Sequence, residues 1–254
     1  MTGQAIAPPP LTAGDALFLD FDGTLAGLQD DPDTVFLAPG MDLVLEAVGD
    51  RLHGALAILS GRDAGDLARR VPGGLWRVGN HGLIPLAPDQ QAPDTRASAP
   101  DAVRGAIEKI SAMFHGTRVE TKGPVLALHY RQAPNAADDL AIALAEAGLS
   151  GAGYRIQHGK FVFEAKPQDA NKGHALARMM HEAPFAGRRP VMIGDDTTDE
   201  DAFRAANDLG GLTIKVGAGD TVSRIPRAAR TREAPRRVGA VRVHIAVVRL
   251  QRTL

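Results

Sequence analysis

The stretch ALFLDFDGTL, residues 16–25, gives the strongest indication of the fold. Its first four residues form an aliphatic run that is typical of a buried strand, and Asp20 and Asp22 follow where that strand should end. Two carboxylates at this spacing, followed by Gly23 and Thr24 in a turn, can serve one metal ion and one phosphoryl group. A strand that ends in solvated acids is the alternative, and the complete run makes it the weaker interpretation.

Similar short apolar runs recur along the chain, at residues 55–59, 191–194 and 212–216. Between the first two runs, residues 41–52 carry apolar side chains at helical spacing. Strands that alternate with helices predict an α/β fold with a parallel sheet and helices on both faces. Ligands of such sheets bind beyond the carboxyl ends of the strands, and these ends carry Asp20, Ser60 and Asp195.

A second acidic run, GDDTTDED at residues 194–201, follows the strand at 191–194. Thr198 and Asp201 fit a capping box at the start of a helix. Capping does not explain Asp195 and Asp196, which would repel each other unless a cation lay between them. Clustered hard oxygen ligands without His or Cys predict a Mg²⁺ site here.

Two further polar positions complete a set suited to phosphoryl transfer. Ser60 follows the second strand, where its hydroxyl can bond a phosphate oxygen, and Lys172 opens a helical pattern over residues 172–181. A lysine near the nucleophile offsets carboxylate–phosphate repulsion, which is about 4 kcal/mol for unit charges ~4 Å apart at an effective dielectric of ~20. Taken alone, Ser60 fits a helix N-cap and Lys172 a surface lysine, so the assignment depends on the two acidic clusters.

The middle of the chain predicts a small inserted α+β domain. After a polar linker at residues 85–100 come a helix at 101–115, a strand at 124–131, a helix at 135–148 and two strands flanking Gly159. Alternation along the first strand puts Leu126, Leu128 and Tyr130 on one face and His129 and Arg131 on the other. In the last strand, Phe161 and Phe163 share a face opposite Lys160 and Glu164. The polar face is either solvated or a binding surface.

These elements, in this order, resemble the haloacid dehalogenase (HAD) superfamily of aspartyl phosphatases from residue 16 to about 221. The resemblance implies a Rossmann-like HAD core, with Asp20 as nucleophile, Asp22 as general acid/base, Ser60 as phosphate donor and Lys172 as charge neutraliser. It also implies a Mg²⁺ shell of Asp20, the Asp22 carbonyl and Asp195, supported by Asp196 and Asp199. Phosphate-binding residues would be Gly23, Thr24, Ser60, Gly61, Arg62 and Lys172.

A closer resemblance is to the trehalose-6-phosphate phosphatases, through LSGR at 59–62, GNHG at 79–82, LHYR at 128–131, GKFVFEAKP at 159–167, NKGHAL at 171–176 and GDDTTDEDAF at 194–203. It implies that the inserted domain is a cap that closes over a sugar. The implied sugar-binding residues are Asn80, His81, Gly82, His129, Arg131, Lys160 and Glu164.

The implied activity is Mg²⁺-dependent hydrolysis of trehalose 6-phosphate to trehalose and phosphate through an aspartyl-phosphate, in trehalose biosynthesis. A phosphatase for sucrose phosphate, mannosylglycerate phosphate or a monosaccharide phosphate remains an alternative. A non-catalytic module that binds a sugar phosphate or a synthase is a second alternative, although Asp20, Asp22, Lys172 and Asp195 are all present.

Composition excludes several other classes. The net charge of −1 argues against a nucleic-acid binder, and the absence of Cys excludes disulfides and thiolate metal sites. No apolar run approaches the roughly 18 residues of a membrane span, and the N-terminus lacks the pattern of a signal peptide. We therefore expect a cytoplasmic enzyme with a sugar phosphate substrate, with no membrane or nucleic-acid partner and with trehalose-6-phosphate synthase as a candidate partner.

The expected organisation is a core first part at residues 1–86, a cap at 87–168, a core second part at 169–222 and an atypical basic tail at 223–254. The tail carries nine Arg and one acidic residue, Glu233, and so offsets an acidic excess in the rest of the chain. Residues 241–248 alternate as a strand would. A shifted reading frame near residue 223 is the favoured explanation, and a natural basic extension is the alternative.

Overall fold

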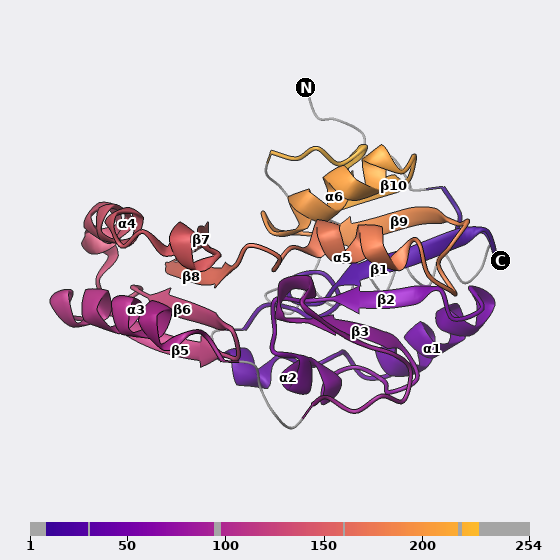
Figure 1. The fold of residues 1–254 in the computed structure, drawn as a ribbon. Helices are drawn as coiled ribbons and strands as arrows, with labels where there is room; N and C mark the ends of the chain where they lie inside the picture. The colour runs from indigo at the N-terminus through magenta and orange to yellow at the C-terminus, as the bar shows by residue number, and fades with distance from the viewer. Residues whose placement is uncertain (1–8, 30, 94–97, 160, 218–219, 229–254) are drawn as a thin grey trace. The chain divides into compact units, whose positions relative to one another are not determined.

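The computed structural model describes residues 9–29, 31–93, 98–159, 161–217 and 220–228 (Figure 1). Its contacts divide the chain into two compact units. The core unit comprises Met1–Ala92 and Asn171–Leu254, and the cap unit is Pro93–Ala170, where the sequence predicts 87–168. The second unit is therefore inserted between two parts of the first.

A seven-stranded sheet forms the centre of the core unit, in the order β11-β10-β9-β1-β2-β3-β4. Its strands are β1 (Asp15–Asp20), β2 (Leu56–Leu59), β3 (Trp76–Gly79), β4 (Ile84–Leu86), β9 (Arg189–Gly194), β10 (Leu212–Val216) and β11 (Ile225–Ala228). All neighbours pair in parallel except β3 and β4. The predicted α/β fold with a parallel sheet is confirmed, with one antiparallel strand at its edge.

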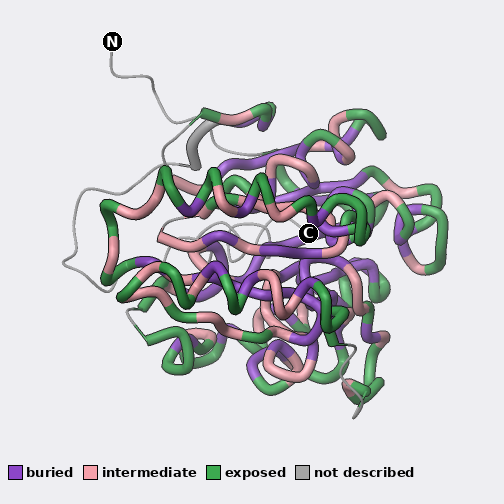
Figure 2. Tube along the Cα trace, turned by 60° about the vertical axis from the view of Figure 1, so that its left-hand side comes forward, coloured by how far each residue is buried: buried purple, intermediate pink, exposed green. Residues whose placement is uncertain are grey.

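The middle strand of this sheet is β1, which pairs with β2 on one side and β9 on the other. All six of its residues are buried, as Figure 2 shows for the core strands generally. Phe18 stacks on Phe185 at 5.3 Å between ring centres. An uninterrupted aliphatic run is typical of such a strand, because both faces of a parallel sheet are covered and every side chain is buried.

The α-helices found in the described part of the core unit are α1 (Met41–Arg51), α2 (Ala64–Ala68), α5 (Lys172–Met179) and α6 (Asp199–Asp208). Asn171 caps α5, because its Oδ1 accepts the N–H groups of Gly173 (2.7 Å) and His174 (3.1 Å). Gly173 lets α5 and α6 pack closely, since a Cβ there would lie 2.4 Å from the carbonyl oxygen of Asp201. The N-cap bonds explain the Asn at position 171, and the close approach of the two helices explains the Gly at position 173.

The predicted capping box at the start of α6 is wrong. Thr198 is the N-cap residue, but its backbone is already helical (φ −73°, ψ −21°) and its side chain makes no capping bond to the described residues. Asp196 Oδ1 accepts the N–H of Thr198 instead. The Asp201 carboxylate bonds Asn171 and Arg204.

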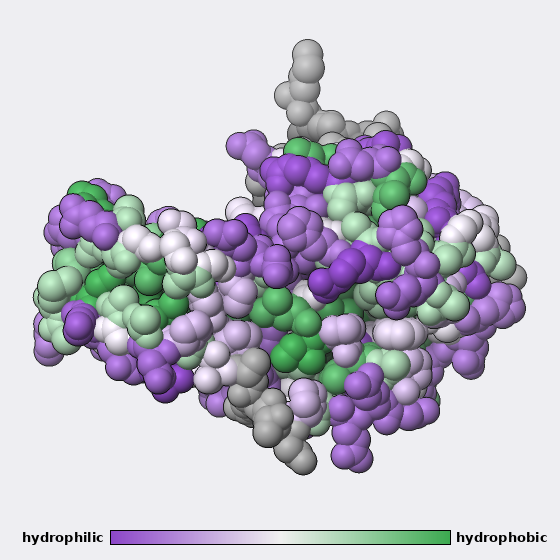
Figure 3. Space-filling view, viewed as in Figure 1, coloured by the Kyte–Doolittle hydropathy of each residue, from purple (hydrophilic) through white to green (hydrophobic). Residues whose placement is uncertain are grey.

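The described residues of the cap unit form an antiparallel sheet, in the order β5-β6-β8-β7, together with the α-helices α3 and α4. Its elements are β5 (Arg118–Lys122), β6 (Val125–His129), β7 (Tyr154–Gly159), β8 (Val162–Pro167), α3 (Asp101–Met113) and α4 (Ala137–Glu146). Leu126, Leu128, Tyr130 and Phe163 belong to its buried apolar cluster, as the alternation predicts. Figure 3 shows further hydrophobic surface where α3 and α4 lie.

The basic segment at 223–254 begins with a strand of the core sheet. β11 pairs in parallel with β10, so ordered core structure continues past residue 222, where the sequence predicts its end. The alternating residues 241–248 lie outside the described residues, and the shifted-frame hypothesis therefore stays a prediction. Within the described ranges, every helix is too short or too polar to cross a membrane.

Candidate active site

Three strands of the core bring their polar ends to one edge of the sheet. Asp20 ends β1 and pairs in register with Leu59, the residue before Ser60. Leu19 pairs with Ile193 of β9, two residues before Asp195. Because these strands are parallel neighbours, Asp20, Ser60 and Asp195 follow the same edge, as the sequence predicts.

Three carboxylates form a compact acidic cluster at this edge. One oxygen each from Asp20, Asp195 and Asp199 lies within 4.8 Å of the others. Asp199, the first residue of α6, packs against Gly194, where a Cβ would lie 2.4 Å from the Asp199 carboxyl carbon. Asp199 Oδ2 also accepts the N–H groups of Asp195 (2.9 Å) and Asp196 (3.1 Å). These bonds hold the acidic loop against the strand end.

Lys172 places its ammonium group between two of these carboxylates. Its Nζ donates to Asp20 Oδ1 (2.6 Å) and Asp199 Oδ1 (2.7 Å), and its side chain is only 3% exposed. Burial would lower the pKa of Lys172, but the charges of Asp199 and Asp20 outweigh it and hold the pKa well above its usual value. Lys172 is therefore a permanent cation beside Asp20.

The acidic cluster has more negative charge than one lysine balances. Burial, and then the charge of Asp199, raise the pKa of Asp20 well above its ordinary value despite Lys172. Burial, followed by the charges of Asp199 and Asp196, raises the pKa of Asp195 to about 7. Asp20 Oδ2 is buried and meets no hydrogen-bond donor among the described residues. A hard cation fits these oxygens, because it would satisfy the orphaned atom and offset the repulsion. The cluster could thus hold a metal ion.

The turn after β1 lies against Asp195. Gly23 has φ +84°, and a Cβ there would lie 2.1 Å from Asp195 Oδ2, so a side chain at this position would displace the carboxylate. The buried Thr24 donates from Oγ1 to Asp195 Oδ1 at 3.4 Å. The predicted phosphate-binding pair thus also positions a carboxylate of the cluster.

The loop after β2 rests on a short turn at Asn80–Gly82. Ser60 Oγ accepts the N–H of Arg62 (3.1 Å), and within the described part of the chain no acceptor takes its hydroxyl proton. Asn80 donates from its backbone to the carbonyl of Arg62 (2.6 Å), and His81 donates to that of Ser60 (3.0 Å). Ser60 does not cap α2, because Asp63 does so through the N–H of Gly65.

Asn80 and His81 are both buried and both left-handed, with φ +53° and +56°. The side chain of Asn80 accepts the N–H of Ala64 (2.9 Å). The ring of His81 packs on Gly61, where a Cβ would lie 2.6 Å from its Cε1 atom. Non-glycine residues in this conformation each cost about 1–3 kcal/mol and are typical of functional sites. The structure thus places both against the Ser60 loop.

Gly82 completes this turn by meeting the start of α5. Its carbonyl accepts a bond from Arg178 Nη2 (2.8 Å), and a Cβ there would lie 2.6 Å from the carbonyl oxygen of Asn171. The turn therefore connects the Ser60 loop to the helix that carries Lys172.

Arg62 and Asp22 pair with each other rather than entering the acidic cluster. Arg62 Nε and Nη2 donate to the two Asp22 oxygens at 2.8 and 2.7 Å. Asp196 is exposed, and its carboxylate caps the turn toward α6. The acidic cluster therefore consists of Asp20, Asp195 and Asp199 without the side chains of Asp22 and Asp196.

The polar face of the cap sheet contains a linked group of charged residues. His129 Nε2 bonds Glu120 Oε2 at 2.7 Å, and Lys122 Nζ lies 3.8 Å from the same oxygen. The bond from His129 is the first cause of a lowered pKa at Glu120. Glu120 and Glu164 share this face, because both pair with Ala127 in register. Sequence reasoning missed Glu120 and Lys122, although the alternation of RVETK could have found them.

The other predicted cap residues lie elsewhere or are not described. The Arg131 guanidinium lies over the Phe161 ring, 5.6 Å from its centre, after β6 has ended. Lys160 lies outside the described residues. In the core unit, sequence reasoning also missed Asn171 as the N-cap residue of α5. An Asn directly before a helical pattern is the signal that could have identified it.

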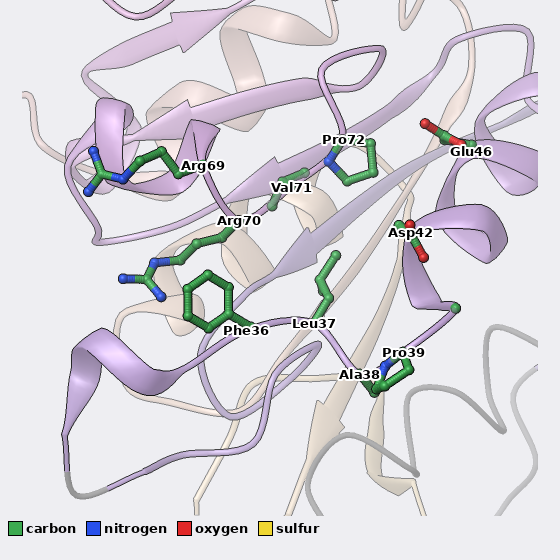
Figure 4. A pocket seen from close by; sticks show the side chains of 11 residues that line it. Phe36, Leu37, Ala38, Pro39, Asp42, Glu46, Arg69, Arg70, Val71 and Pro72 are labelled. Atoms are coloured by element: carbon green, nitrogen blue, oxygen red, sulfur yellow. The ribbon is translucent and has the colours of Figure 1, made fainter.

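A cavity of about 470 Å³ lies elsewhere in the core unit, between the segment before α1 and the residues after α2 (Figure 4). Phe36, Pro39, Glu46 and Arg70 are among its lining residues, and the acidic cluster contributes none. The site that carries the chemistry is thus defined by the strand ends and not by this cavity.

Comparisons with known proteins show the family to which the chain belongs. The family described as Trehalose-phosphatase matches residues 18–235. A probable trehalose-phosphate phosphatase of Sinorhizobium fredii is 40% identical over 222 residues, which are 84% of this chain and 83% of that protein. The trehalose-6-phosphate phosphatase of Escherichia coli is 38% identical over 226 residues, 87% of this chain and 84% of that protein.

The fold has counterparts among solved structures. The C-terminal domain of the Candida albicans trehalose-6-phosphate phosphatase superposes with a TM-score of 0.76 at 20% identity, covering 94% of this chain and 92% of that one. At this identity the likeness supports the fold alone. The length of the family match and the identity to the two bacterial relatives show more: the chain belongs to the trehalose-phosphatase family, whose members are phosphoric monoester hydrolases.

Proposed function

We propose that this protein is a Mg²⁺-dependent phosphatase that hydrolyses trehalose 6-phosphate to trehalose and phosphate. The observation that carries the proposal is the buried pair of Lys172 and Asp20, joined to Asp195 and Asp199 at the strand ends. Family membership implies a sugar phosphate substrate, and the names of the bacterial relatives specify trehalose phosphate. All-oxygen ligands favour Mg²⁺ over softer metals.

In the proposed mechanism a carboxylate oxygen of Asp20 attacks phosphorus, and the bond from phosphorus to the sugar oxygen breaks. Asp22 gives a proton to that oxygen. Water then attacks the phosphorus of the aspartyl-phosphate while Asp22 takes its proton, and the phosphorus–Asp20 bond breaks to release phosphate. Each step is balanced, because the proton that Asp22 gives in the first step is regained in the second.

The remaining residues stabilise charge on the phosphoryl group. Lys172 bonds Asp20 and places a positive charge beside the attacked phosphoryl group, and Ser60 has a hydroxyl proton to donate. The N–H groups of Thr24 and Gly61 are suited to the phosphate oxygens, whereas the N–H of Gly23 donates to the carbonyl of Ala26 (2.7 Å) and holds the turn. A Mg²⁺ ion held by Asp20, Asp195 and the Asp22 carbonyl would supply positive charge to these oxygens when bound.

The polar face of the cap sheet is the proposed sugar site. Glu120, Lys122, His129 and Glu164 provide both donors and acceptors, which a disaccharide rich in hydroxyls requires. The roles of Arg131 and Lys160 as sugar ligands rest on the family resemblance alone. We propose that Asn80, His81 and Gly82 act on the sugar indirectly, through the loop of Ser60 that they hold.

A phosphate-release panel tests the proposal. Trehalose 6-phosphate, sucrose 6-phosphate, mannosylglycerate phosphate and glucose 6-phosphate are offered with Mg²⁺ and with a chelator. We expect release from trehalose 6-phosphate only, and only with Mg²⁺. Faster release from sucrose 6-phosphate would overturn the substrate, and release from none would favour a non-catalytic binding module.

Two variants link turnover to the site. Asp20→Asn should abolish turnover while its circular dichroism stays that of the wild type, because the nucleophile is lost and the side-chain volume is kept. Asp208→Asn is the matched control, since Asp208 is an exposed acid at the end of α6. A near-normal rate in Asp20→Asn would exclude the aspartyl-phosphate mechanism.

A synthase partner and a cytoplasmic location complete the proposal. The partner is proposed because a trehalose-6-phosphate synthase supplies the substrate, and the location is the one that we expect from the sequence. Co-purification with such a synthase and cell fractionation are the respective tests.

A further inference from the structure

Arg62 makes a two-point contact with Asp22 within the core unit. Its Nε donates to Asp22 Oδ2 (2.8 Å) and its Nη2 to Asp22 Oδ1 (2.7 Å), so the planar guanidinium meets both oxygens. Nη2 also donates to the carbonyl of Pro32 (3.0 Å), and the guanidinium carbon lies 5.5 Å from the centre of the Phe21 ring. Arg62 therefore contacts the segment around Asp22 at three places.

Asp66 on α2 holds Arg62 from behind. It accepts Arg62 Nη1 (2.8 Å) together with Nε (3.0 Å) and Nη2 (2.9 Å) of Arg70. Arg70 Nη1 in turn donates to the carbonyl of Asp33 (3.2 Å), and its guanidinium lies over the Phe36 ring at 4.6 Å (Figure 4). One carboxylate thus anchors two arginines that hold the chain downstream of Asp22.

The contacts leave Arg62 little capacity to bind phosphate, the role that the resemblance implies. A guanidinium has five N–H donors. The bonds to Asp22, Asp66 and the Pro32 carbonyl use four of them, and the Arg62 side chain is only 11% exposed. The bonding capacity of Arg62 is thus directed at Asp22 and at its own support.

We propose that Arg62 is a positioning residue for the proton transfers of Asp22, and that Asp66 sets the position of Arg62. The inference rests on the proposed function, because the mechanism proposed there gives Asp22 the role of general acid and base. Without the two bonds from the Arg62 guanidinium, the Asp22 side chain is free to rotate about its two single bonds. A misplacement of about 1 Å can cost roughly 10²-fold in rate.

If Arg62 positions Asp22, the rate lost on removing Arg62 should depend on the leaving group of the substrate. A sugar alkoxide needs the proton of Asp22 to depart, whereas nitrophenolate departs without one. Loss of positioning should therefore slow phosphoryl transfer from a sugar phosphate and spare transfer from para-nitrophenyl phosphate. Loss of a phosphate ligand would slow both equally and would weaken the binding of inorganic phosphate.

The variants are Arg62→Ala, Arg62→Lys, which keeps the charge but not the fork, and Asp66→Asn. Arg69→Ala is the matched control, because Arg69 Nη2 also bonds Asp66 (2.9 Å) while its side chain is 65% exposed. For each full-length variant we measure kcat and KM for trehalose 6-phosphate and the inhibition constant of inorganic phosphate. The pre-steady-state burst with para-nitrophenyl phosphate and thermal unfolding complete the set.

We expect kcat for trehalose 6-phosphate to fall about 10- to 100-fold in Arg62→Ala and Arg62→Lys, within the contribution of general acid–base catalysis. The kcat of Asp66→Asn should fall less, and the kcat of Arg69→Ala should match that of the wild type. KM, the phosphate inhibition constant and the nitrophenol burst rate should stay within about threefold. Added guanidinium should partly restore kcat in Arg62→Ala only.

Equal losses with both leaving groups, or a phosphate inhibition constant that rises with KM, would overturn the positioning role. So would a normal kcat in Arg62→Ala. If the wild type releases phosphate from another sugar phosphate but not from trehalose 6-phosphate, the proposed substrate fails while the Arg62 comparison still decides this inference. If the wild type hydrolyses no phosphate ester, both proposals are wrong.

Discussion

Replacing Lys172 by Met removes the cation of a buried cluster and keeps most of the side-chain volume. The Lys172 ammonium lies 2.6 Å from Asp20 Oδ1 and 2.7 Å from Asp199 Oδ1. At an effective dielectric of ~20, each pair is worth about 6 kcal/mol of gross attraction. Desolvation of the charges offsets much of this, and removing one partner of a buried pair costs about 3–5 kcal/mol net. We therefore expect Lys172→Met to lose about 3 kcal/mol of unfolding free energy.

Urea unfolding in a chelating buffer, followed by fluorescence, measures this loss. Trp76 is the single tryptophan and lies in β3, so its emission follows the core unit. Arg204→Met is the matched control, because Arg204 bonds Asp201 at 2.9 Å but is 58% exposed, and such pairs are worth at most ~1 kcal/mol.

Added Mg²⁺ should recover more stability in Lys172→Met than in the wild type, since a cation offsets the carboxylates that the lysine no longer neutralises. A Lys172→Met loss no larger than that of Arg204→Met in chelator would refute the electrostatic reasoning. An equal response of both proteins to Mg²⁺ would refute the metal assignment.

Three further predictions follow from the geometry. Gly23→Ala should weaken Mg²⁺ binding by at least ~10-fold in calorimetry, because its Cβ would displace Asp195 and alanine resists φ +84° at a cost of about 1–2 kcal/mol; Gly74→Ala, with open space, should have no effect. Gly105→Ala should stabilise the cap by about 0.5–1 kcal/mol in thermal unfolding, since Gly105 lies inside α3 with open space around it. Burial would raise the pKa of Asp66, but bonds from Arg70 and Arg62 outweigh it and lower the pKa below the ordinary 3.8. The stabilisation is therefore complete well above pH 3.8 and is lost as the pH falls below that value, so the gap in unfolding free energy between the wild type and Asp66→Asn should be constant near neutral pH and should narrow progressively below about pH 4.

Most of the core elements could be predicted from the sequence because their patterns are local. The aliphatic runs at β1 and β10 are found within a residue of their expected limits, and a parallel sheet requires such runs to be buried on both faces. β5 was missed because RVETK is polar, which an edge strand tolerates. β3 was missed because WRVG is short and its Arg77 is buried through bonds to backbone carbonyls.

The candidate site likewise has features that local sequence patterns predict and features that they do not. The pattern of strands predicts that Asp20, Ser60 and Asp195 lie together, because strand ends of one parallel sheet share an edge. The partners of these residues are known only from the folded chain: Lys172 lies 152 positions from Asp20, and Arg62 lies 40 positions from the Asp22 that it holds. Such contacts depend on how helices pack against the sheet, and no local pattern of residues encodes the direction of a long charged side chain.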